Sequence, residues 1–270
     1  MTKKIRPFLK WAGNKYNCLE QILMSLPAAN RLIEPFAGSA AIFINSNYPN
    51  YLVAEENKDL IALFSCLQKE GETFIAYCEQ FFCPDNNYAS QYYALRQIFN
   101  QENDPRLRAA IFLYLNRHGY NGLCRYNKQG IYNVPFGRYD KPYFPREEMI
   151  FFHHKSQMAH FIHADFRKTF ALAKPGDVIY CDPPYAPRHQ LTNFSSYIHK
   201  KFGQTEQILL AKLAMESATK GITVIISNHD TEFTRHHYQH AEIISFSVKR
   251  SINRNGKNRL PVKELLAVFR

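Results

Sequence analysis

The chain has 270 residues, of which 46% are hydrophobic, including 21 Phe and 17 Tyr, and this composition excludes a disordered chain. Lys and Arg total 34 against 23 Asp and Glu, and the formal net charge of +11 favours a polyanion, with nucleic acid preferred over a membrane surface. No apolar run reaches the roughly 20 residues of a membrane-spanning helix, and the first residues lack the apolar segment of a secretory signal. We therefore expect a soluble protein that is not exported, built as a core domain with a smaller insertion.

Cysteine and histidine spacings do not indicate a metal site. The six cysteines have no paired spacing typical of zinc or of a disulfide framework, and we interpret them as reduced thiols; they stand at 18, 66, 78, 83, 124 and 181. The histidine pairs at 153–154 and 236–237 point to different sides of a helix or strand, so we expect no metal ligands there.

Short apolar runs alternate with helical patterns, which predicts an α/β sheet covered by helices. The runs lie at 31–36, 40–46, 51–55, 177–181, 222–227 and 263–269. Between about 56 and 145 the character changes, because helical periodicity at 57–68 and 105–120 is followed by a stretch rich in Gly and Tyr at 121–144. We expect a helical insertion over 56–145 that carries a hairpin or long loop, with 1–55 and 146–270 forming the sheet domain.

The first motif in chain order is FLKWAGNK at 8–15, a basic and aromatic segment that by itself could be a solvated tail packing one Trp. The second is EPFAGSA at 34–40, where a strand, a turn of small residues and a helix start would let a ligand approach the backbone. It lacks G-x-G-x-x-G and GK[ST], which argues against dinucleotides and ATP. Glu55 ends the next strand, where a carboxylate can accept both hydroxyls of a ribose; its alternative role is that of a neighbour of a helix N-cap.

The most specific motif is Asp182-Pro183-Pro184-Tyr185, directly after the apolar run at 177–181. It places polar groups at the carboxyl edge of the sheet, although a proline-stiffened turn with an aspartate cap is the alternative. Asp182 and the Pro183 carbonyl can each accept an N–H of an adenine amine, which frees the nitrogen lone pair for attack on a sulfonium methyl. The Tyr185 ring offers a stacking surface to a base taken out of the duplex.

Together these motifs identify a resemblance to the Dam family of adenine methyltransferases, in which a cofactor loop, a recognition domain and DPPY follow in this order. The resemblance covers nearly the whole chain. Besides FLKWAGNK, EPFAGS and DPPYAP, it includes FLYLNRHGYNGLCRYN, NVPFGRYDKPYFP, ISNHDT at 226–231 and RSIN at 250–253.

The resemblance implies a Rossmann-like sheet that uses S-adenosyl-L-methionine and a target-recognition domain at 56–145. It also implies transfer of a methyl group to N6 of the adenine of GATC in double-stranded DNA, by base flipping. It implies no obligate protein partner, and a cytoplasmic place of action beside the nucleoid of a bacterium, or a phage origin. By resemblance the cofactor residues are Trp11, Lys15, Phe36, Gly38, Ser39, Glu55, Asp165, Phe166 and Asp182. The catalytic residues are Asp182, Pro183, Pro184 and Tyr185.

For DNA the resemblance implies two groups of residues. The group that reads GATC comprises Lys10, Leu123, Arg125, Pro135 and Tyr139, and the group that fills the space left by the extruded base comprises Tyr120 and Asn121. The chemistry agrees, because Arg can form two hydrogen bonds to guanine O6 and N7, and Leu or Pro can contact a thymine methyl.

Three positions depart from the family pattern. Asn14 and Ala40 stand where glycines are common, and Glu55 stands where the ribose carboxylate is usually an aspartate. We expect Asn14 to adopt the positive φ of the glycine it replaces, so that the turn survives. Two other function classes stay open at this point. One is an amine methyltransferase acting on RNA or protein, which Asp182 and the insertion disfavour; the other is a catalytically inactive DNA-binding protein, which the intact DPPY disfavours.

Overall fold

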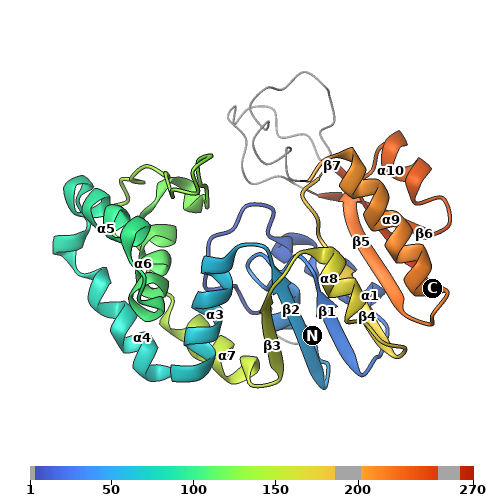
Figure 1. Cartoon of the computed structure of the whole chain (residues 1–270), viewed down its shortest axis with the longest axis horizontal. Helices are drawn as coiled ribbons and strands as arrows, with labels where there is room; N and C mark the ends of the chain where they lie inside the picture. Colours follow the sequence, from blue (N-terminus) through green and yellow to red (C-terminus); the bar gives the residue numbers. More distant parts are fainter. Residues whose placement is uncertain (1–3, 186–201, 249–261) are drawn as a thin grey trace. The chain divides into compact units, whose positions relative to one another are not determined.

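The structure is a computed structural model, and it describes residues 4–185, 202–248 and 262–270 (Figure 1). The stretch RSIN at 250–253 and the last two residues of DPPYAP, which contribute to the resemblance, lie outside the described residues.

Seven strands form one sheet in the order β3-β2-β1-β4-β5-β7-β6. Strand β1 pairs in parallel with β2 and β4, β4 pairs in parallel with β5, and β7 is antiparallel to both β5 and β6. The strands are β1 (Arg31–Glu34), β2 (Asn50–Glu55), β3 (Ala159–His163), β4 (Asp177–Cys181), β5 (Thr223–His229), β6 (Glu242–Val248) and β7 (Val262–Phe269). This mixed, mainly parallel sheet confirms the predicted α/β class.

α-Helices account for half of the remaining described residues. The helices are α1 (Leu19–Ser25), α2 (Ala41–Asn45), α3 (Lys58–Glu70), α4 (Glu72–Glu79), α5 (Ala89–Gln101), α6 (Pro105–His118), α7 (Arg146–Ser156), α8 (Phe166–Ala171), α9 (Gln204–Ala218) and α10 (Glu232–His237). Of the six apolar runs, five form strands, and the run at 40–46 forms α2. The predicted hairpin is short: Tyr126 and Tyr132 form an isolated antiparallel bridge around a turn at 127–130.

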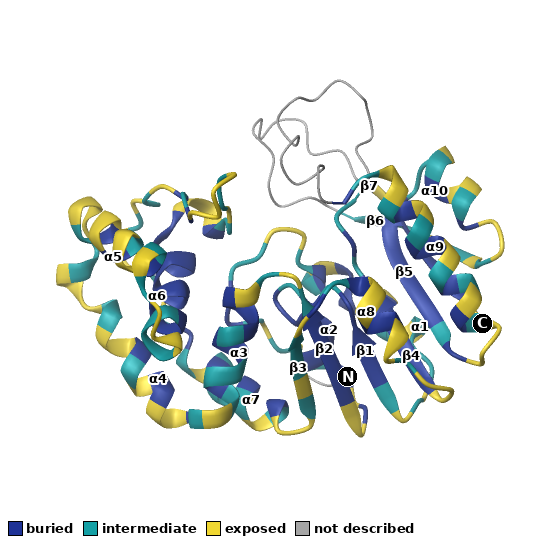
Figure 2. Ribbon diagram, in the orientation of Figure 1, coloured by how far each residue is buried: buried dark blue, intermediate teal, exposed yellow. Residues whose placement is uncertain are grey.

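Two strands, β3 and β6, have no counterpart among the predicted runs. They stand at the two ends of the sheet order, and no residue of either is fully buried. By contrast, all five residues of β4 and six of the seven in β5 are buried, which Figure 2 shows in dark blue. Parallel strands covered on both faces are continuous apolar runs, whereas end strands need no such run, so the sequence indicates only the inner strands clearly.

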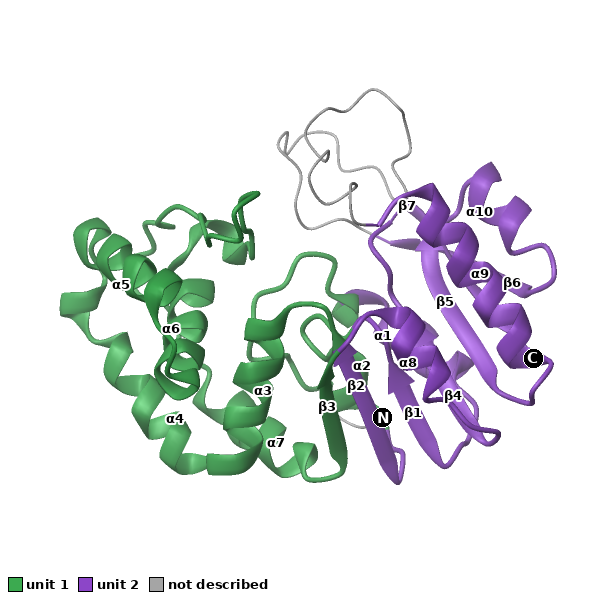
Figure 3. Cartoon of the chain, viewed as in Figure 1, with its two compact units in different colours: residues 1–16, 37–46, 55–163 green, residues 17–36, 47–54, 164–270 purple. Residues whose placement is uncertain are grey.

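Contacts within the chain divide it into two compact units (Figure 3). Unit 1 comprises residues 1–16, 37–46 and 55–163, and unit 2 comprises residues 17–36, 47–54 and 164–270. This grouping differs from the expected boundaries at 55 and 145. The assignment of 56–145 to target recognition concerns function and stays a prediction.

Aromatic packing explains why two early segments group with the helices of unit 1. The Phe8 ring centroid lies 5.1 Å from that of Phe152 and 6.0 Å from that of Phe64. Phe43 in α2 lies 5.6 Å from the same Phe152. All four rings are buried, so the segments 1–16 and 37–46 share an apolar core with α3 and α7.

In unit 2, β1 and β4 lie next to each other, with Ile33 opposite Ile179. The chain order of the strands changes direction between β1 and β4. In open α/β sheets, ligands bind at the carboxyl ends of the strands beside such a change. The residues that follow β1 and β4 are Pro35-Phe36 and the DPPY tetrad, so the sheet places these two segments of unit 2 at this position.

Candidate functional site

The loop after β1 brings Trp11, Gly38 and Glu55 together within unit 1. The Glu55 carboxylate accepts the backbone N–H of Gly38 at 3.0 Å and that of Asn57 at 3.3 Å. Burial raises the pKa of Glu55, while these N–H groups act in the opposite direction. Gly38 has φ of +49°, and a Cβ added there would lie 2.9 Å from Trp11 Nε1. Only glycine allows the indole to lie this close to the backbone.

The turn of the FLKWAGNK motif survives, but the expectation for Asn14 was wrong. The positive φ, +79°, belongs to Gly13, and Asn14 is not among the described residues with positive φ. Instead, the Asn14 side chain accepts the N–H of Tyr16 at 2.7 Å, which is a local turn bond that asparagine makes readily. Lys15 is buried and donates from Nζ to the Gly13 carbonyl at 2.9 Å.

Ala40, the second departure, adopts the left-handed conformation that a glycine would favour. Its φ is 59° and ψ is 33°, at the residue that precedes α2. The Ala40 N–H donates to the Ala37 carbonyl at 2.7 Å, which closes the turn over Gly38 and the buried Ser39. The loop therefore keeps its shape although alanine carries a steric penalty in this region.

In unit 2, two predicted cofactor residues form part of an aromatic cluster. Phe36 and Phe166 stack with ring centroids 5.6 Å apart, and Phe202 lies edge-on at 5.4 Å from Phe36 and 5.5 Å from Phe166. Asp165 caps α8 by accepting the N–H groups of Arg167 and Lys168. Phe166 and Phe202 are buried, so the half-buried Phe36 is the ring of this cluster on which a purine could pack.

Side chains of α9, β5 and β7 form hydrogen bonds with the last two residues of the DPPY tetrad. The Pro184 carbonyl accepts an N–H from Gln207 Nε2 at 2.7 Å. The Tyr185 hydroxyl lies 2.9 Å from Ser227 Oγ and donates to Glu264 Oε2 at 3.2 Å. Burial, together with Asp182 and Glu264, raises the pKa of Tyr185 well above its ordinary value, so the hydroxyl stays a proton donor.

The sequence analysis included Ser227 and His229 only as members of ISNHDT, with no role for them, and it did not name Gln207 or Glu264. Gln207 is buried, and its Oε1 accepts an N–H from Asn228 at 3.0 Å. His229 lies edge-on to Tyr185, with ring centroids 4.5 Å apart. The sequence did contain one indication of Ser227 and His229: ISNHDT lies at the carboxyl end of the predicted strand 222–227, as DPPY lies at the carboxyl end of 177–181. No sequence signal marks Gln207 or Glu264.

Three of the seven residues assigned to DNA recognition, Lys10, Asn121 and Tyr139, come together in unit 1. The Lys10 ammonium lies 3.9 Å from the centroid of the Tyr139 ring, and the Tyr139 hydroxyl accepts the N–H of Asn121 at 2.9 Å. Burial, with Arg117 nearby, lowers the pKa of Lys10. Asn121 has φ of 53°, a conformation that asparagine tolerates better than most residues.

The remaining recognition residues, one of them assigned to the vacated space and three to reading GATC, lie on or beside the hairpin. Tyr120 is exposed and donates its N–H to the carbonyl of the exposed Pro135 at 2.9 Å. Leu123 accepts a hydrogen bond from the Tyr132 hydroxyl at 3.1 Å. Arg125 is exposed and donates from Nε and Nη2 to Asn133, at 2.7 and 3.1 Å. A guanidinium has five N–H groups, so these two bonds orient Arg125 and leave further donors for a base edge.

Two further observations apply to the part of the chain that the structure describes. It contains no group of three or more His, Cys, Asp or Glu side chains placed to hold a metal ion. None of its helices is long and apolar enough to cross a membrane.

A family model described as D12 class N6 adenine-specific DNA methyltransferase matches residues 11–252. The chain therefore belongs to this family of DNA methyltransferases, whose methyl donor is S-adenosyl-L-methionine. The chain is 48% identical to a DNA adenine methylase of Vibrio cholerae serotype O1, over 99% of this chain and 97% of that protein. It is 48% identical to a DNA adenine methylase of Haemophilus influenzae and 45% identical to one of Escherichia coli K12. These alignments cover 98% and 99% of this chain, and 94% and 96% of those proteins. The predicted class, an adenine-specific DNA methyltransferase, is confirmed.

Proposed function

We propose that this methyltransferase acts on the adenine of GATC in double-stranded DNA, and that the adenine leaves the duplex before its N6 is methylated. The observation that supports the proposal is the contact of Tyr139 with Lys10, which is also assigned to reading GATC, and with Asn121, which is assigned to the space left by the extruded base. Lys10, Asn121 and Tyr139 come from distant parts of the chain, and Tyr139 contacts both of the others. Such a cluster presents cationic and polar donors together, as readout of base edges requires.

The cofactor residues fit S-adenosyl-L-methionine chemically. Glu55 supplies a carboxylate for the ribose hydroxyls beside the backbone of Gly38, and Trp11 lies against the same glycine. Phe36, which stacks on the buried Phe166, supplies apolar surface for an adenine ring. When bound, the cofactor supplies an electrophilic methyl group on a sulfonium.

Asp182 and the Pro183 carbonyl are proposed to accept the two N–H groups of the target amine. These bonds withdraw the nitrogen lone pair from the ring and direct it towards the methyl group, and they strengthen as positive charge develops on N6. The Pro184 carbonyl already bonds to Gln207, and the Tyr185 hydroxyl bonds to Ser227 and Glu264. The tetrad is therefore held in position before the base arrives, with the Tyr185 ring available for stacking.

The recognition residues divide by chemistry. Arg125 fits the O6 and N7 edge of a guanine, and Leu123 and Pro135 fit a thymine methyl. The exposed Tyr120, together with Asn121, is proposed to occupy the space that the adenine vacates. We place this activity in the cytoplasm of a bacterium, or of a cell carrying phage DNA, with DNA as the sole obligatory macromolecular partner.

The proposal is tested by methyl transfer from radiolabelled S-adenosyl-L-methionine to duplexes that carry one GATC or one of its single-base variants. We expect transfer to N6 of adenine in GATC and much slower transfer to every variant. Equal rates on all duplexes would refute GATC specificity. Transfer to RNA or protein instead would favour the other amine-methyltransferase class.

The matched variants are Asp182→Ala and Asp140→Ala, which change the net charge equally. Asp182→Ala should reduce the rate by at least about a hundredfold, as loss of a bond made in the transition state does, while DNA binding is retained. Asp140 is exposed and has no proposed role, so Asp140→Ala should keep the wild-type rate. Full activity of Asp182→Ala would contradict the mechanism. An inactive wild-type protein that still prefers GATC in binding would identify a DNA-binding protein without catalysis.

A further inference from the structure

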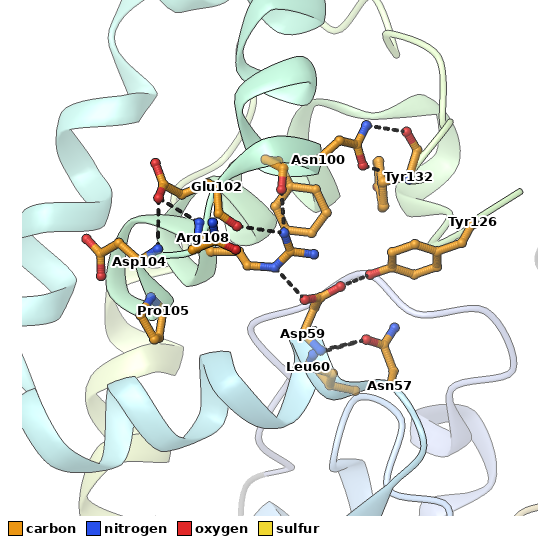
Figure 4. A network of polar contacts seen from close by, with 12 residues as sticks. Asn57, Asp59, Leu60, Asn100, Glu102, Asp104, Pro105, Arg108, Tyr126 and Tyr132 are labelled. Atoms are coloured by element: carbon orange, nitrogen blue, oxygen red, sulfur yellow. Dashed lines mark hydrogen bonds and ion pairs between the residues drawn. The ribbon is translucent and has the colours of Figure 1, made fainter. Parts of the chain in front are cut away.

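Asp59 is a buried carboxylate to which the mechanism gives no role. It lies in the first turn of α3, with 4% of its surface exposed. Its Oδ1 accepts from Arg108 Nε at 2.8 Å, and its Oδ2 accepts from the Tyr126 hydroxyl at 2.6 Å (Figure 4). A buried carboxylate is costly unless it is paired and hydrogen-bonded, so both partners are held where the carboxylate needs them.

Arg108 is itself fixed by other groups. Its Nη1 donates to the carbonyls of Phe99 and Glu102 at the end of α5, at 2.5 and 3.2 Å. Its guanidinium carbon lies 4.2 Å from the centroid of the Phe99 ring. Asp59 is a residue of α3, and Arg108 links its carboxylate to the end of α5. The position of the carboxylate is therefore fixed, and its second oxygen is a fixed acceptor for the Tyr126 hydroxyl.

Tyr126 lies on the segment of residues 123–133, which we call the recognition loop. Successive residues of an extended segment point to opposite sides. Cys124 and Tyr126 make the inner contacts: Cys124 Sγ accepts from Asn57 Nδ2 at 3.2 Å, and Tyr126 donates to Asp59. Arg125, between them, is exposed. The two inner anchors therefore determine the side and the position at which Arg125 leaves the loop.

A third anchor holds the returning strand of the loop. Tyr132 donates its N–H to Asn100 Oδ1 at 2.8 Å and accepts from Asn100 Nδ2 at its carbonyl, at 3.1 Å. The Tyr126 ring lies edge-on to that of Tyr132, at 5.5 Å. Burial, followed by the neighbouring Cys124 and Asp59, raises the pKa of Tyr126, so its hydroxyl remains the donor to the carboxylate.

We propose that Asp59 is a positioning residue for sequence recognition: through the Tyr126 hydroxyl it fixes the register of the recognition loop, and thereby the direction in which Arg125 meets a base. Asp59 touches neither cofactor nor target base in this role. Its loss should change which sequences are methylated more than it changes the methylation of the best sequence. This inference rests on the GATC function proposed above.

The test compares Tyr126→Phe with Tyr143→Phe. Tyr126→Phe removes one hydroxyl but keeps the ring against Tyr132. Tyr143→Phe removes the same kind of bond, because the exposed Tyr143 hydroxyl donates to Glu148 Oε2 at 2.9 Å, outside the recognition loop. For each protein, kcat/KM is measured on GATC and on duplexes altered at each guanine pair, at fixed salt, together with the Kd for S-adenosyl-L-methionine. Arg125→Ala is measured in the same way, because removal of the Arg125 side chain gives the largest loss of discrimination between GATC and the guanine-altered duplexes that a misplaced Arg125 could cause.

Tyr126→Phe should reduce the ratio of kcat/KM on GATC to kcat/KM on a guanine-altered duplex by about three- to tenfold. This corresponds to part of the free energy of one hydrogen bond to a charged group, because the loop keeps its other anchors. The cofactor Kd should stay unchanged, and Tyr143→Phe should keep the wild-type ratio. Asp59→Asn should also reduce the ratio, because Arg108 loses its charged partner and the charge-assisted bond to the Tyr126 hydroxyl becomes at best a neutral one. An equal fall on every duplex, or the same ratio in Tyr143→Phe and Tyr126→Phe, would overturn the inference. If the wild type itself shows no preference for GATC, the proposed function fails instead.

Discussion

His118 should make unit 1 sensitive to mild acid. The residue ends α6 and is 1% exposed, and its Nδ1 bonds to the Tyr114 carbonyl at 3.0 Å. Burial lowers its pKa to about 4 from the ordinary value of 6.5, and the cations Lys10 and Arg117 contribute in the same direction. The imidazole is therefore neutral in the folded protein at neutral pH.

The sign of the effect follows from proton binding. Between pH 6.5 and 4 the unfolded chain binds a proton at this residue and the folded protein does not, so stability falls as the pH falls. From the two pKa values, the free energy of unfolding should decrease by about 2 kcal/mol at pH 5 and by about 3 kcal/mol at pH 4, relative to neutral pH. Above pH 6.5, the ordinary pKa of His118, this residue no longer lowers the free energy of unfolding.

The measurement is urea unfolding followed by the fluorescence of Trp11, which is the single Trp of the chain and belongs to the same unit. The control is His118→Asn, whose amide can replace the Nδ1 donor but does not titrate. The variant starts from lower stability because it loses ring packing, so only the change between pH 7 and pH 5 is compared. A change in His118→Asn equal to that of the wild type would refute the reasoning, because other groups would then cause the acid sensitivity.

Two further predictions concern the cofactor loop. Glu55→Ala should raise the Kd for S-adenosyl-L-methionine at least about tenfold, because the ribose hydroxyls and the Gly38 N–H lose a charged acceptor worth about 1.5–3 kcal/mol; an unchanged Kd in titration calorimetry would remove Glu55 from the site. Ala40→Gly should raise the free energy of unfolding by up to about 1 kcal/mol, because it relieves the left-handed conformation. Its control, Ala41→Gly in the right-handed first turn of α2, should lower stability by about 1 kcal/mol, and equal effects of the two changes in urea unfolding would show that no strain is relieved at Ala40.

The sequence alone determined the fold class, the chemistry and the family. Buried parallel strands are continuous apolar runs, so β1, β2, β4 and β5 could be predicted. The motifs at their carboxyl ends, which include Glu55 at the end of β2 and the DPPY tetrad after β4, could be predicted with them. Those motifs indicate their chemistry through their residue types, because a carboxylate and a backbone carbonyl can accept the N–H groups of an amine. The roles of individual reading residues, including Arg125, stay predictions.

Only the tertiary structure decided which distant residues support these motifs. Ser227 and Glu264 reach Tyr185 because β5 and β7 are neighbours in the sheet, a pairing that no local pattern encodes. In the sequence, Asp59 is an ordinary acidic residue at the start of a helix. In the structure it contacts Arg108, because α3 packs against α6, and it also accepts a hydrogen bond from Tyr126. The reason is physical: periodicity and turn chemistry act over a few residues, whereas burial of a polar side chain depends on partners that the chain brings together only after it has folded.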